Sequence, residues 1–400
     1  MHVCRSSSRY RTTIARLTAL ALVACTAPVV HFWSADAHHD RISDPAPRTT
    51  EARLPTGLDL DPSAVTVSGL SSGAFFAHQF HIAYSALVAG VGIIAGGPYG
   101  CTEIIEHPLR PSSRLDQVSA AVVACTHFYG SRYWGLRPRP PSAERVLSLI
   151  ADAARQGAID DPRHLVADRV WLFHGARDRV VPAAVAAVLG EVYRGLGVTG
   201  PHLHIAQGDP ARPASHGMPV ERFTGESRFP RRACSEHAAP FIIECGFDAA
   251  GSLLRHLYSE GFSDASADPH AAGTLAAFSQ TEFLDARSSS GSLSRVGYIY
   301  VPAECRGARC RLHVAFHGCR QNVDAQGSGR IHDDFVRDAG YNRWAAGNRI
   351  VVLYPQMTES AVNPNACWDF WAYSGSEYRS RQGPQMRAVR AMVARLLGSE

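Results

Sequence analysis

The sequence lacks several features that would point to a particular partner or site. It contains no lysine, and its 40 basic residues, all arginine, nearly balance 36 acidic ones, so that the formal net charge is +4. With no clustered basic face, a nucleic acid is not an expected partner. No cysteine pair has C-x-x-C spacing and no His/Cys cluster has zinc spacing, so neither a metal nor another cofactor is expected. Internal repeats and a linker to a separate C-terminal binding module are also lacking.

Long apolar runs are scarce as well. The longest, residues 17–30, follows four arginines and ends too soon for a transmembrane helix, which needs about 20 apolar residues. A small-x-small site follows at 35–37, the pattern of a secretory signal peptide. We predict a signal peptide over 1–37, a flexible linker over 38–57 and one catalytic domain over 58–400, in a monomer exported to the periplasm or beyond. Leu-Val-Ala-Cys at 22–25 resembles a lipoprotein box, so lipidation of Cys25 is the alternative to cleavage after Ala37.

Eight cysteines would remain after removal of the leader. An even number in an exported chain favours four disulfides. The expected pairs are Cys101–Cys125, Cys234–Cys245, Cys305–Cys310 and Cys319–Cys367. Eight cysteines permit about 105 pairings, so other connectivities stay open.

Segments with the apolar pattern of strands alternate with segments of helical periodicity. Strands are expected near 64–67, 91–95, 169–173, 202–205, 296–301, 312–316 and 349–354, and helices near 74–80, 143–156, 183–196 and 385–397. The loop-rich stretches 262–273 and 287–294 bracket a weaker segment. This alternation predicts an α/β fold around a largely parallel sheet.

The most informative motif is Gly-Leu-Ser-Ser-Gly at residues 69–73. It lies between an expected strand and an expected helix, the context that makes Gly-x-Ser-x-Gly a nucleophile elbow. There the glycines permit a strained turn that exposes the serine hydroxyl, and the helix N-terminus offers N–H groups to a developing negative charge. We therefore predict Ser71 as a nucleophile, the alternative being a Gly/Ser loop that matches the motif by chance.

A serine nucleophile needs a base and an acid that orients the base, and hydrolases of this sheet type place them in the order Ser, Asp or Glu, His. Asp178 follows the expected strand 169–173, at the strand end where α/β sites form. His216 lies in a loop after the next strand and is the first choice for the base. Candidates that the sequence leaves open are Asp209 and Asp248 for the acid and His202, His204 and His237 for the base.

The oxyanion hole gives a further clue to the fold. One donor is expected to be the backbone N–H of Ser72, directly after the nucleophile. The second normally comes from a His-Gly loop that precedes the nucleophile, but no such motif precedes Ser71. His-Gly-Cys occurs instead at 317–319, after the expected strand 312–316. We infer a circularly permuted arrangement, in which strands usually N-terminal to the elbow come at the end of the chain; a simple β-turn is the alternative.

Several stretches together carry a family resemblance. They are Gly-Leu-Ser-Ser-Gly-Ala at 69–74, Cys234 with Pro-Phe-Ile-Ile-Glu-Cys-Gly-Phe-Asp at 240–248, Tyr-Val-Pro at 300–302 to Cys305, His-Val-Ala-Phe-His-Gly-Cys-Arg-Gln at 313–321 and Asn-Ala-Cys-Trp-Asp-Phe-Trp at 365–371. In this order, over most of 64–397, they resemble the single-domain poly(3-hydroxybutyrate) depolymerases and their esterase relatives.

The resemblance implies a fold and a set of roles. The fold would be a circularly permuted α/β-hydrolase, with Ser71, Asp178 and His216 as the catalytic triad. The resemblance further implies backbone oxyanion donors at Ser72 and Cys319, a Cys319–Cys367 bridge that fixes the oxyanion loop, and contact between Trp368 and the substrate acyl chain.

The expected activity is hydrolysis of poly(3-hydroxybutyrate) or its oligomers, so the expected partner is a polyester or oligoester. Two alternatives remain at this point. A feruloyl or acetyl-xylan type of carboxylesterase shares the elbow chemistry, and a non-catalytic exported binding protein could use the same scaffold.

Overall fold

The computed structural model describes residues 52–103, 125–126, 141–222, 230–259, 261–266, 268, 272–284, 292–323 and 333–399. The predicted signal peptide and Cys25 lie outside these residues. All described residues belong to one compact unit. No helix in the described part of the chain is long and apolar enough to cross a membrane.

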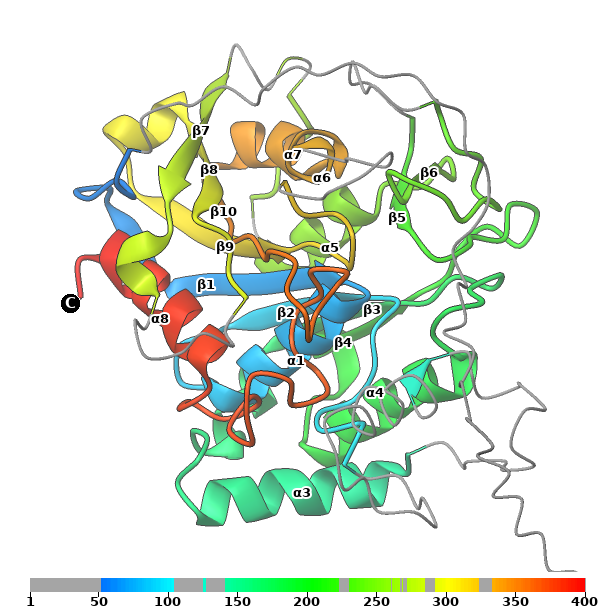
Figure 1. Cartoon of the computed structure of the whole chain (residues 1–400). Helices are drawn as coiled ribbons and strands as arrows, with labels where there is room; N and C mark the ends of the chain where they lie inside the picture. Colours follow the sequence, from blue (N-terminus) through cyan, green and yellow to red (C-terminus); the bar gives the residue numbers. More distant parts are fainter. Residues whose placement is uncertain are drawn as a thin grey trace, which may run out of the picture. The chain divides into compact units, whose positions relative to one another are not determined.

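An eight-stranded sheet in the order β4-β3-β2-β1-β9-β10-β8-β7 forms the centre of the fold (Figure 1). Its strands are β1 (Leu60–Leu70), β2 (Gly90–Ile94), β3 (Arg169–Phe173), β4 (Leu203–Ala206), β7 (Gly273–Ser279), β8 (Val296–Pro302), β9 (Cys310–Phe316) and β10 (Ile350–Tyr354). All neighbours from β4 to β10 pair in parallel, and β8 alone runs against both of its neighbours. The predicted α/β fold with a largely parallel sheet is confirmed.

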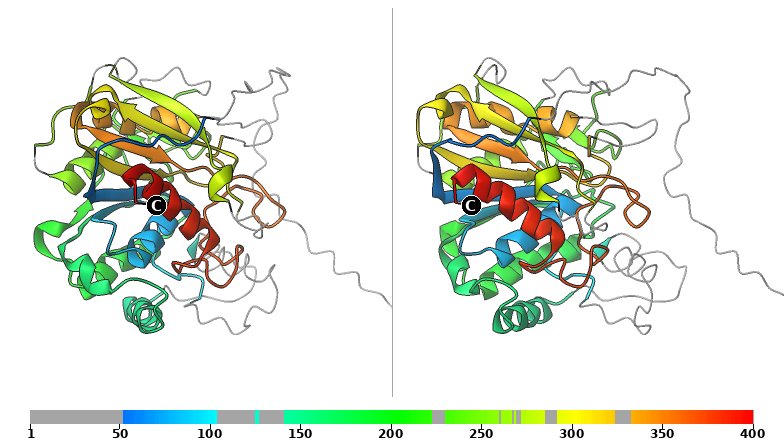
Figure 2. Two further views of the ribbon diagram at one scale, coloured as in Figure 1. Left: turned by 90° about the vertical axis from the view of Figure 1, so that its left-hand side faces the viewer. Right: turned by 60° about the vertical axis from the view of Figure 1, so that its left-hand side comes forward.

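Helices cover both faces of this sheet, and each face has its own apolar core (Figures 1 and 2). The larger core includes residues of α1 (Ser72–Ala83), α3 (Ala143–Arg155), α4 (Ala183–Gly195) and α8 (Pro384–Leu397), and the smaller one includes residues of α5 (Ala249–Tyr258), α6 (Asp334–Asp338) and α7 (Tyr341–Asn348). The strands β5 (Met218–Val220) and β6 (Ile242–Glu244) pair in a separate two-stranded sheet. Burial on both faces explains why the parallel strands are almost continuously apolar in sequence.

The strand order accounts for the late position of the His-Gly-Cys motif. β9 pairs in parallel with β1, with Thr66 opposite His313 and Gly69 opposite Phe316, although more than 200 residues separate them. The segments that follow these two strands, the elbow and the His-Gly-Cys loop, therefore emerge at the same edge of the sheet. This arrangement is the one expected from a circularly permuted α/β-hydrolase.

The packed domain begins earlier than the predicted boundary at residue 58. Ala52 forms a bridge with Phe278 in β7, and its carbonyl accepts a hydrogen bond of 2.8 Å from the N–H of Ser279. The side chain of Leu54 is buried in the larger core. The buried Leu54 and the pairing with the edge strand β7 therefore anchor the last six residues of the predicted linker to the domain.

A buried series of hydrogen bonds ties β1 to β9 below the elbow. His313 lies between Thr66 and Ser68, with 2.7 Å from Nδ1 to Thr66 Oγ1 and from Nε2 to Ser68 Oγ. Tyr258 donates to a main-chain carbonyl of β9 and accepts from Thr66, so Thr66 must accept from Nδ1–H of His313. Nε2 then accepts from Ser68, and Ser68 accepts from Tyr341. Burial lowers the pKa of His313 to about 3, in keeping with this neutral tautomer.

A pH-dependent change in stability is expected at Asp338, in the last turn of α6. Burial, with repulsion from Asp334 and Asp333, raises the pKa of this carboxyl to about 7. Because its pKa in the folded state exceeds 3.8, the folded state holds the proton more tightly, and stability is lost as pH rises from about 4 to 7. We expect Asp338→Asn to raise the free energy of unfolding by about 1 kcal/mol at pH 8 and less at pH 4, after allowance for solvent screening.

Urea unfolding at the two pH values measures this effect. Asp59→Asn, at an exposed carboxylate, serves as the control for the change in net charge. An equal gain at pH 4 and pH 8 would contradict the assignment to proton binding.

Candidate active site

Ser71 occupies a strained turn between β1 and α1. Its φ of 55° and ψ of −121° lie in a region that non-glycine residues rarely adopt, and it is the N-cap of α1. The carbonyl of Ser71 accepts from the N–H groups of Ala74 and Phe75, and its own N–H donates to Ile94 at 3.0 Å. The surrounding backbone therefore holds the strained serine in place, as in a nucleophile elbow.

The two motif glycines are required by close backbone contacts. A Cβ atom on Gly69 would lie 2.2 Å from the carbonyl oxygen of Gly73, and one on Gly73 would lie 2.4 Å from the carbonyl oxygens of Phe316 and His317. These contacts bring the first turn of α1 directly against the end of β9. Small residues at both positions thus allow the nucleophile and the His-Gly-Cys loop to approach each other.

We expect Gly73→Ala to destabilise the protein by about 3 kcal/mol, because the added methyl group meets main-chain atoms that cannot move independently. Thermal and urea unfolding measure the loss. Gly307→Ala is the matched control, because φ there is −149° and nothing lies within 4 Å of the added carbon. Equal stability of the two variants would show that the close approach at Gly73 is not tight.

Three of the predicted site residues form one hydrogen-bonded series. His216 Nε2 lies 2.8 Å from Ser71 Oγ, and His216 Nδ1 lies 2.8 Å from Asp178 Oδ2. The carboxylate accepts from Nδ1–H, so Nε2 is the free acceptor that faces the serine hydroxyl. All three residues lie on segments that follow β1, β3 and β4, at one edge of the sheet.

Asp178 is buried and held by further contacts. Its other oxygen, Oδ1, accepts from the N–H groups of Val180 at 2.7 Å and Val181 at 3.0 Å. Burial opposes the charged form, but His216 and the N–H of Val180 hold the pKa of this carboxyl below its usual value. Asp178 therefore stays a carboxylate that can orient His216 and stabilise its protonated form.

The other sequence candidates do not reach Ser71. Asp248 is the N-cap of α5, and Asp209 accepts from the N–H of Ala211 within its own turn. His204 is exposed on β4 with its ring 5.5 Å from that of His256, and the carbonyl of His202 accepts from His256. His237 lies beside the site, but its Nδ1–H donates to the backbone carbonyl of His216 at 2.9 Å.

The His-Gly-Cys loop lies beside the nucleophile. A Cβ atom on Gly318 would be 3.4 Å from the Cβ atom of Ser71. Within the described residues, the backbone N–H groups of Ser72 and Cys319 donate to no acceptor. A pair of free donors flanking a serine hydroxyl is the arrangement that stabilises the oxyanion of acyl transfer.

Contacts that the sequence did not reveal hold this loop. The side-chain oxygen of Gln321 accepts from the N–H of Gly318 at 2.7 Å, and its Nε2 donates to the carbonyl of Pro240 at 3.0 Å. Nε2 of His317 accepts from the N–H of Met357, so its Nδ1–H must donate to the carbonyl of Gly318. Burial lowers the pKa of His317 to about 4, which is consistent with this neutral form.

Comparisons with known proteins agree with this geometry. No protein-family model matches the chain. A poly(3-hydroxybutyrate) depolymerase from Delftia acidovorans is 36% identical over 343 residues, which are 85% of this chain and 60% of that protein. A polyhydroxybutyrate depolymerase from Talaromyces funiculosus is 27% identical over 354 residues, 85% of this chain and 91% of that protein.

Solved structures give the same result. The PHB depolymerase of Penicillium funiculosum superposes with a TM-score of 0.71 at 26% identity, covering 87% of this chain and 99% of that one. A PHB depolymerase variant complexed with an R3HB trimer matches with the same TM-score and coverage at 25% identity. The chain is thus similar to poly(3-hydroxybutyrate) depolymerases in both sequence and fold. It spans 60% of the length of the Delftia depolymerase.

Trp368, the residue that the family resemblance assigns to the acyl chain, is fully buried. Its ring packs against Phe76 at 4.5 Å and Phe316 at 4.9 Å between centroids. The indole therefore packs directly against the helix that follows the elbow and against the end of β9. The backbone N–H of Trp368 donates to Ser72 Oγ at 3.3 Å. A direct contact with substrate stays a prediction.

All four expected disulfide pairs are present in the structure. Cys319–Cys367 joins the His-Gly-Cys loop to the segment that carries Trp368, and the N–H of Arg320 adds a hydrogen bond of 2.7 Å to the carbonyl of Asn365. The candidate oxyanion donor at Cys319 is thus fixed on both sides.

Removal of this bond by Cys319→Ala with Cys367→Ala should lower kcat by about 10- to 100-fold, because a displaced donor no longer meets the oxyanion. The matched control removes Cys305–Cys310, which lies at the opposite end of the same strand, β9. Steady-state kinetics on a soluble ester measure both variants. The assignment fails if the control pair lowers kcat as much as the loop pair.

Proposed function

We propose that this chain is an exported serine esterase that hydrolyses the ester bonds of poly(3-hydroxybutyrate) or its oligomers through an acyl-enzyme on Ser71. The observation that supports it best is the unbroken series Asp178–His216–Ser71, with distances of 2.8 Å, beside two free backbone N–H groups. The names of the relatives supply the substrate class, since both are hydroxybutyrate depolymerases.

The first half of the reaction forms the acyl-enzyme. Ser71 Oγ attacks the ester carbonyl carbon while His216 Nε2 takes its proton, and Asp178 stabilises the imidazolium. The carbonyl oxygen becomes an oxyanion that accepts from the N–H groups of Ser72 and Cys319. His216 then gives its proton to the leaving alkoxide, which departs as the hydroxyl end of the shortened chain.

The second half releases the acid. His216 removes a proton from water, the resulting hydroxide attacks the acyl carbon, and the same donors hold the second oxyanion. Ser71 leaves with a proton from His216, so the products are one alcohol and one carboxylic acid. This sequence uses only groups of the protein and water and requires no cofactor.

Export and a monomeric state are part of the same proposal. The structure holds four disulfides, which persist in oxidising compartments. The basic, apolar and small-residue pattern of residues 1–37 supports cleavage of a leader before the protein reaches the periplasm or the medium.

Mass spectrometry of the soluble products tests the substrate assignment. We expect an emulsion of amorphous poly(3-hydroxybutyrate) to clear and to yield 3-hydroxybutyrate and its short oligomers. Feruloyl and acetylated sugar esters, offered in parallel, should be hydrolysed far more slowly. Rapid release of ferulate or acetate without attack on the polyester would assign the chain to the small-ester carboxylesterases instead.

A further inference from the structure

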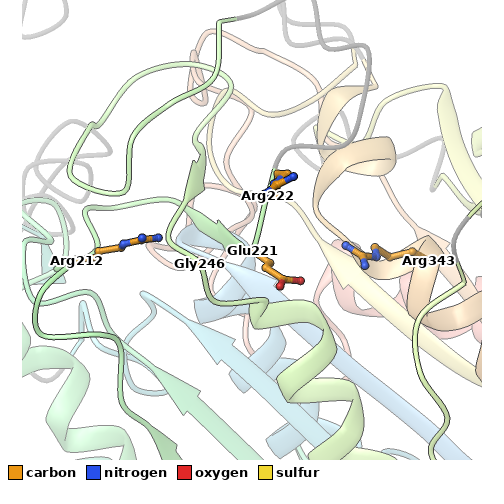
Figure 3. A pocket seen from close by; sticks show the side chains of 5 residues that line it. All are labelled: Arg212, Glu221, Arg222, Gly246 and Arg343. Atoms are coloured by element: carbon orange, nitrogen blue, oxygen red, sulfur yellow. The ribbon is translucent and has the colours of Figure 1, made fainter.

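A cavity that Ser71 does not line lies between the two-stranded sheet and α7. It is lined by Arg212, Glu221, Arg222, Gly246 and Arg343. In Figure 3, Arg212 and Arg343 extend toward each other from opposite sides of this cavity, with Glu221 and Arg222 between them. We refer to it as the arginine cavity.

The exposed side chain of Arg212 lies next to Gly246. Gly246 has φ +64°, a backbone conformation that favours glycine, and a Cβ atom there would lie 2.7 Å from Nη1 of Arg212. The carbonyl of Arg212 also contacts the sulfur of Cys234 at 3.2 Å, and the Cys234–Cys245 disulfide fixes the residue before Gly246. The disulfide thus holds the backbone next to the guanidinium, whose side chain is itself exposed.

Among the residues that the structure describes, those lining the arginine cavity carry more positive than negative charge. No ion pair joins Arg212, Arg222 or Arg343 to a carboxylate within the part of the chain that the structure describes. Glu221 is the carboxylate that lines the cavity among the described residues. Asp248 does not line it but is attracted to Arg343; burial raises the pKa of its carboxyl, and Trp344 donates to it at 2.7 Å. Within the described residues, three arginines and one glutamate therefore line the cavity, while the second acid nearby is buried and already hydrogen-bonded.

The arginine cavity is connected to the loops of the candidate active site. Arg212 and His216 lie in the same loop, and Arg212 also lines a neighbouring cavity with Arg177, the residue before Asp178. The N–H of Arg177 donates to the carbonyl of Ala214 at 2.8 Å, which ties the two loops together. An anion at Arg212 would thus bind to the segment that carries the candidate base.

We propose that the arginine cavity binds a small oxyanion, and that its ligand is the terminal carboxylate that ester hydrolysis creates. Guanidinium groups bind carboxylates through paired hydrogen bonds, and three of them lining one cavity are suited to an anionic ligand. The identity of the ligand rests on the proposed function, whereas the anion site itself does not. A free inorganic oxyanion such as sulfate shares the same chemistry.

Calorimetric titration of the Ser71→Ala protein distinguishes the product carboxylate from a free inorganic oxyanion as the ligand. This variant is used because it leaves a bound ester intact. The probes are the (R)-3-hydroxybutyrate trimer as free acid, its methyl ester, and sodium sulfate, all at low ionic strength. We expect the acid to bind about tenfold more tightly than the ester, and this preference to vanish when Arg222→Gln and Arg343→Gln are added. Arg194→Gln, on an exposed position of α4 that does not line the cavity, is the matched control and should retain the preference.

Each outcome decides the proposal. A preference for the acid that depends on Arg222 and Arg343 supports it, and arginine-dependent binding of sulfate alone supports the anion site but excludes the product carboxylate. Equal binding of acid and ester with no binding of sulfate overturns the proposal, as does a preference that survives the double substitution. Failure of the wild-type protein to hydrolyse the polyester, with arginine-dependent sulfate binding intact, would reject the proposed function and leave the anion site standing.

Discussion

Ser71→Ala should lower kcat for ester hydrolysis by about 10⁶-fold while the protein remains folded. The change removes the atom that attacks the carbonyl, and the remaining catalysis comes only from binding and the oxyanion donors. It removes a single oxygen, and the hydrogen bonds that hold the elbow run through the backbone of residue 71. Turnover of a soluble ester and of a poly(3-hydroxybutyrate) emulsion measures the loss.

Ser63→Ala is a matched control for this prediction, because it removes an exposed hydroxyl near the start of β1 that donates to Asp61. It should keep wild-type turnover. Circular dichroism and thermal unfolding show whether both variants are folded. Residual activity of the folded Ser71→Ala protein near the wild-type rate would mean that another nucleophile does the chemistry.

His216→Ala is expected to lower kcat almost as much, by about 10⁶-fold, because base and nucleophile act as one unit. The substitution removes both the proton acceptor 2.8 Å from Ser71 and the partner of Asp178. The Ser71→Ala/His216→Ala double variant should therefore be no slower than either single variant. Steady-state kinetics of the three proteins test this lack of additivity.

His204→Ala tests whether histidine loss in general impairs the protein. This residue was a sequence candidate for the base but lies exposed on β4. It should keep near-normal turnover. If His204→Ala lost activity and His216→Ala retained it, the base would have to be reassigned.

The main strands and helices were predictable because their apolar patterns are long and regular. The expected strand 169–173 matches β3, and the expected helix 385–397 matches α8 within one residue. β5 and β6 were missed, since strands of three residues carry no measurable periodicity. Helix α5 was also missed, although Asp248 as its N-cap and the apolar positions Leu253, Leu254 and Leu257 were available signals.

The sequence predicted the order of the candidate triad residues along the chain, but not the side-chain contacts that bring them together. The chain order Ser, Asp, His pointed to Asp178 and His216, but among 19 histidines only the fold shows which one reaches Ser71. The support of Gly318 by Gln321 depends on a carbonyl 81 residues away, and the burial of Trp368 depends on two distant phenylalanines. Such long-range contacts leave no local pattern in a single sequence.

Titration of the active protein with a fluorophosphonate ester tests the central claim most directly. Peptide mapping by mass spectrometry locates the adduct, and hydrolysis of poly(3-hydroxybutyrate) is followed in the same samples. We predict one adduct per chain, on Ser71, with hydrolysis lost in proportion to labelling. An adduct on a different residue, or polyester hydrolysis that persists after complete labelling of Ser71, would contradict it.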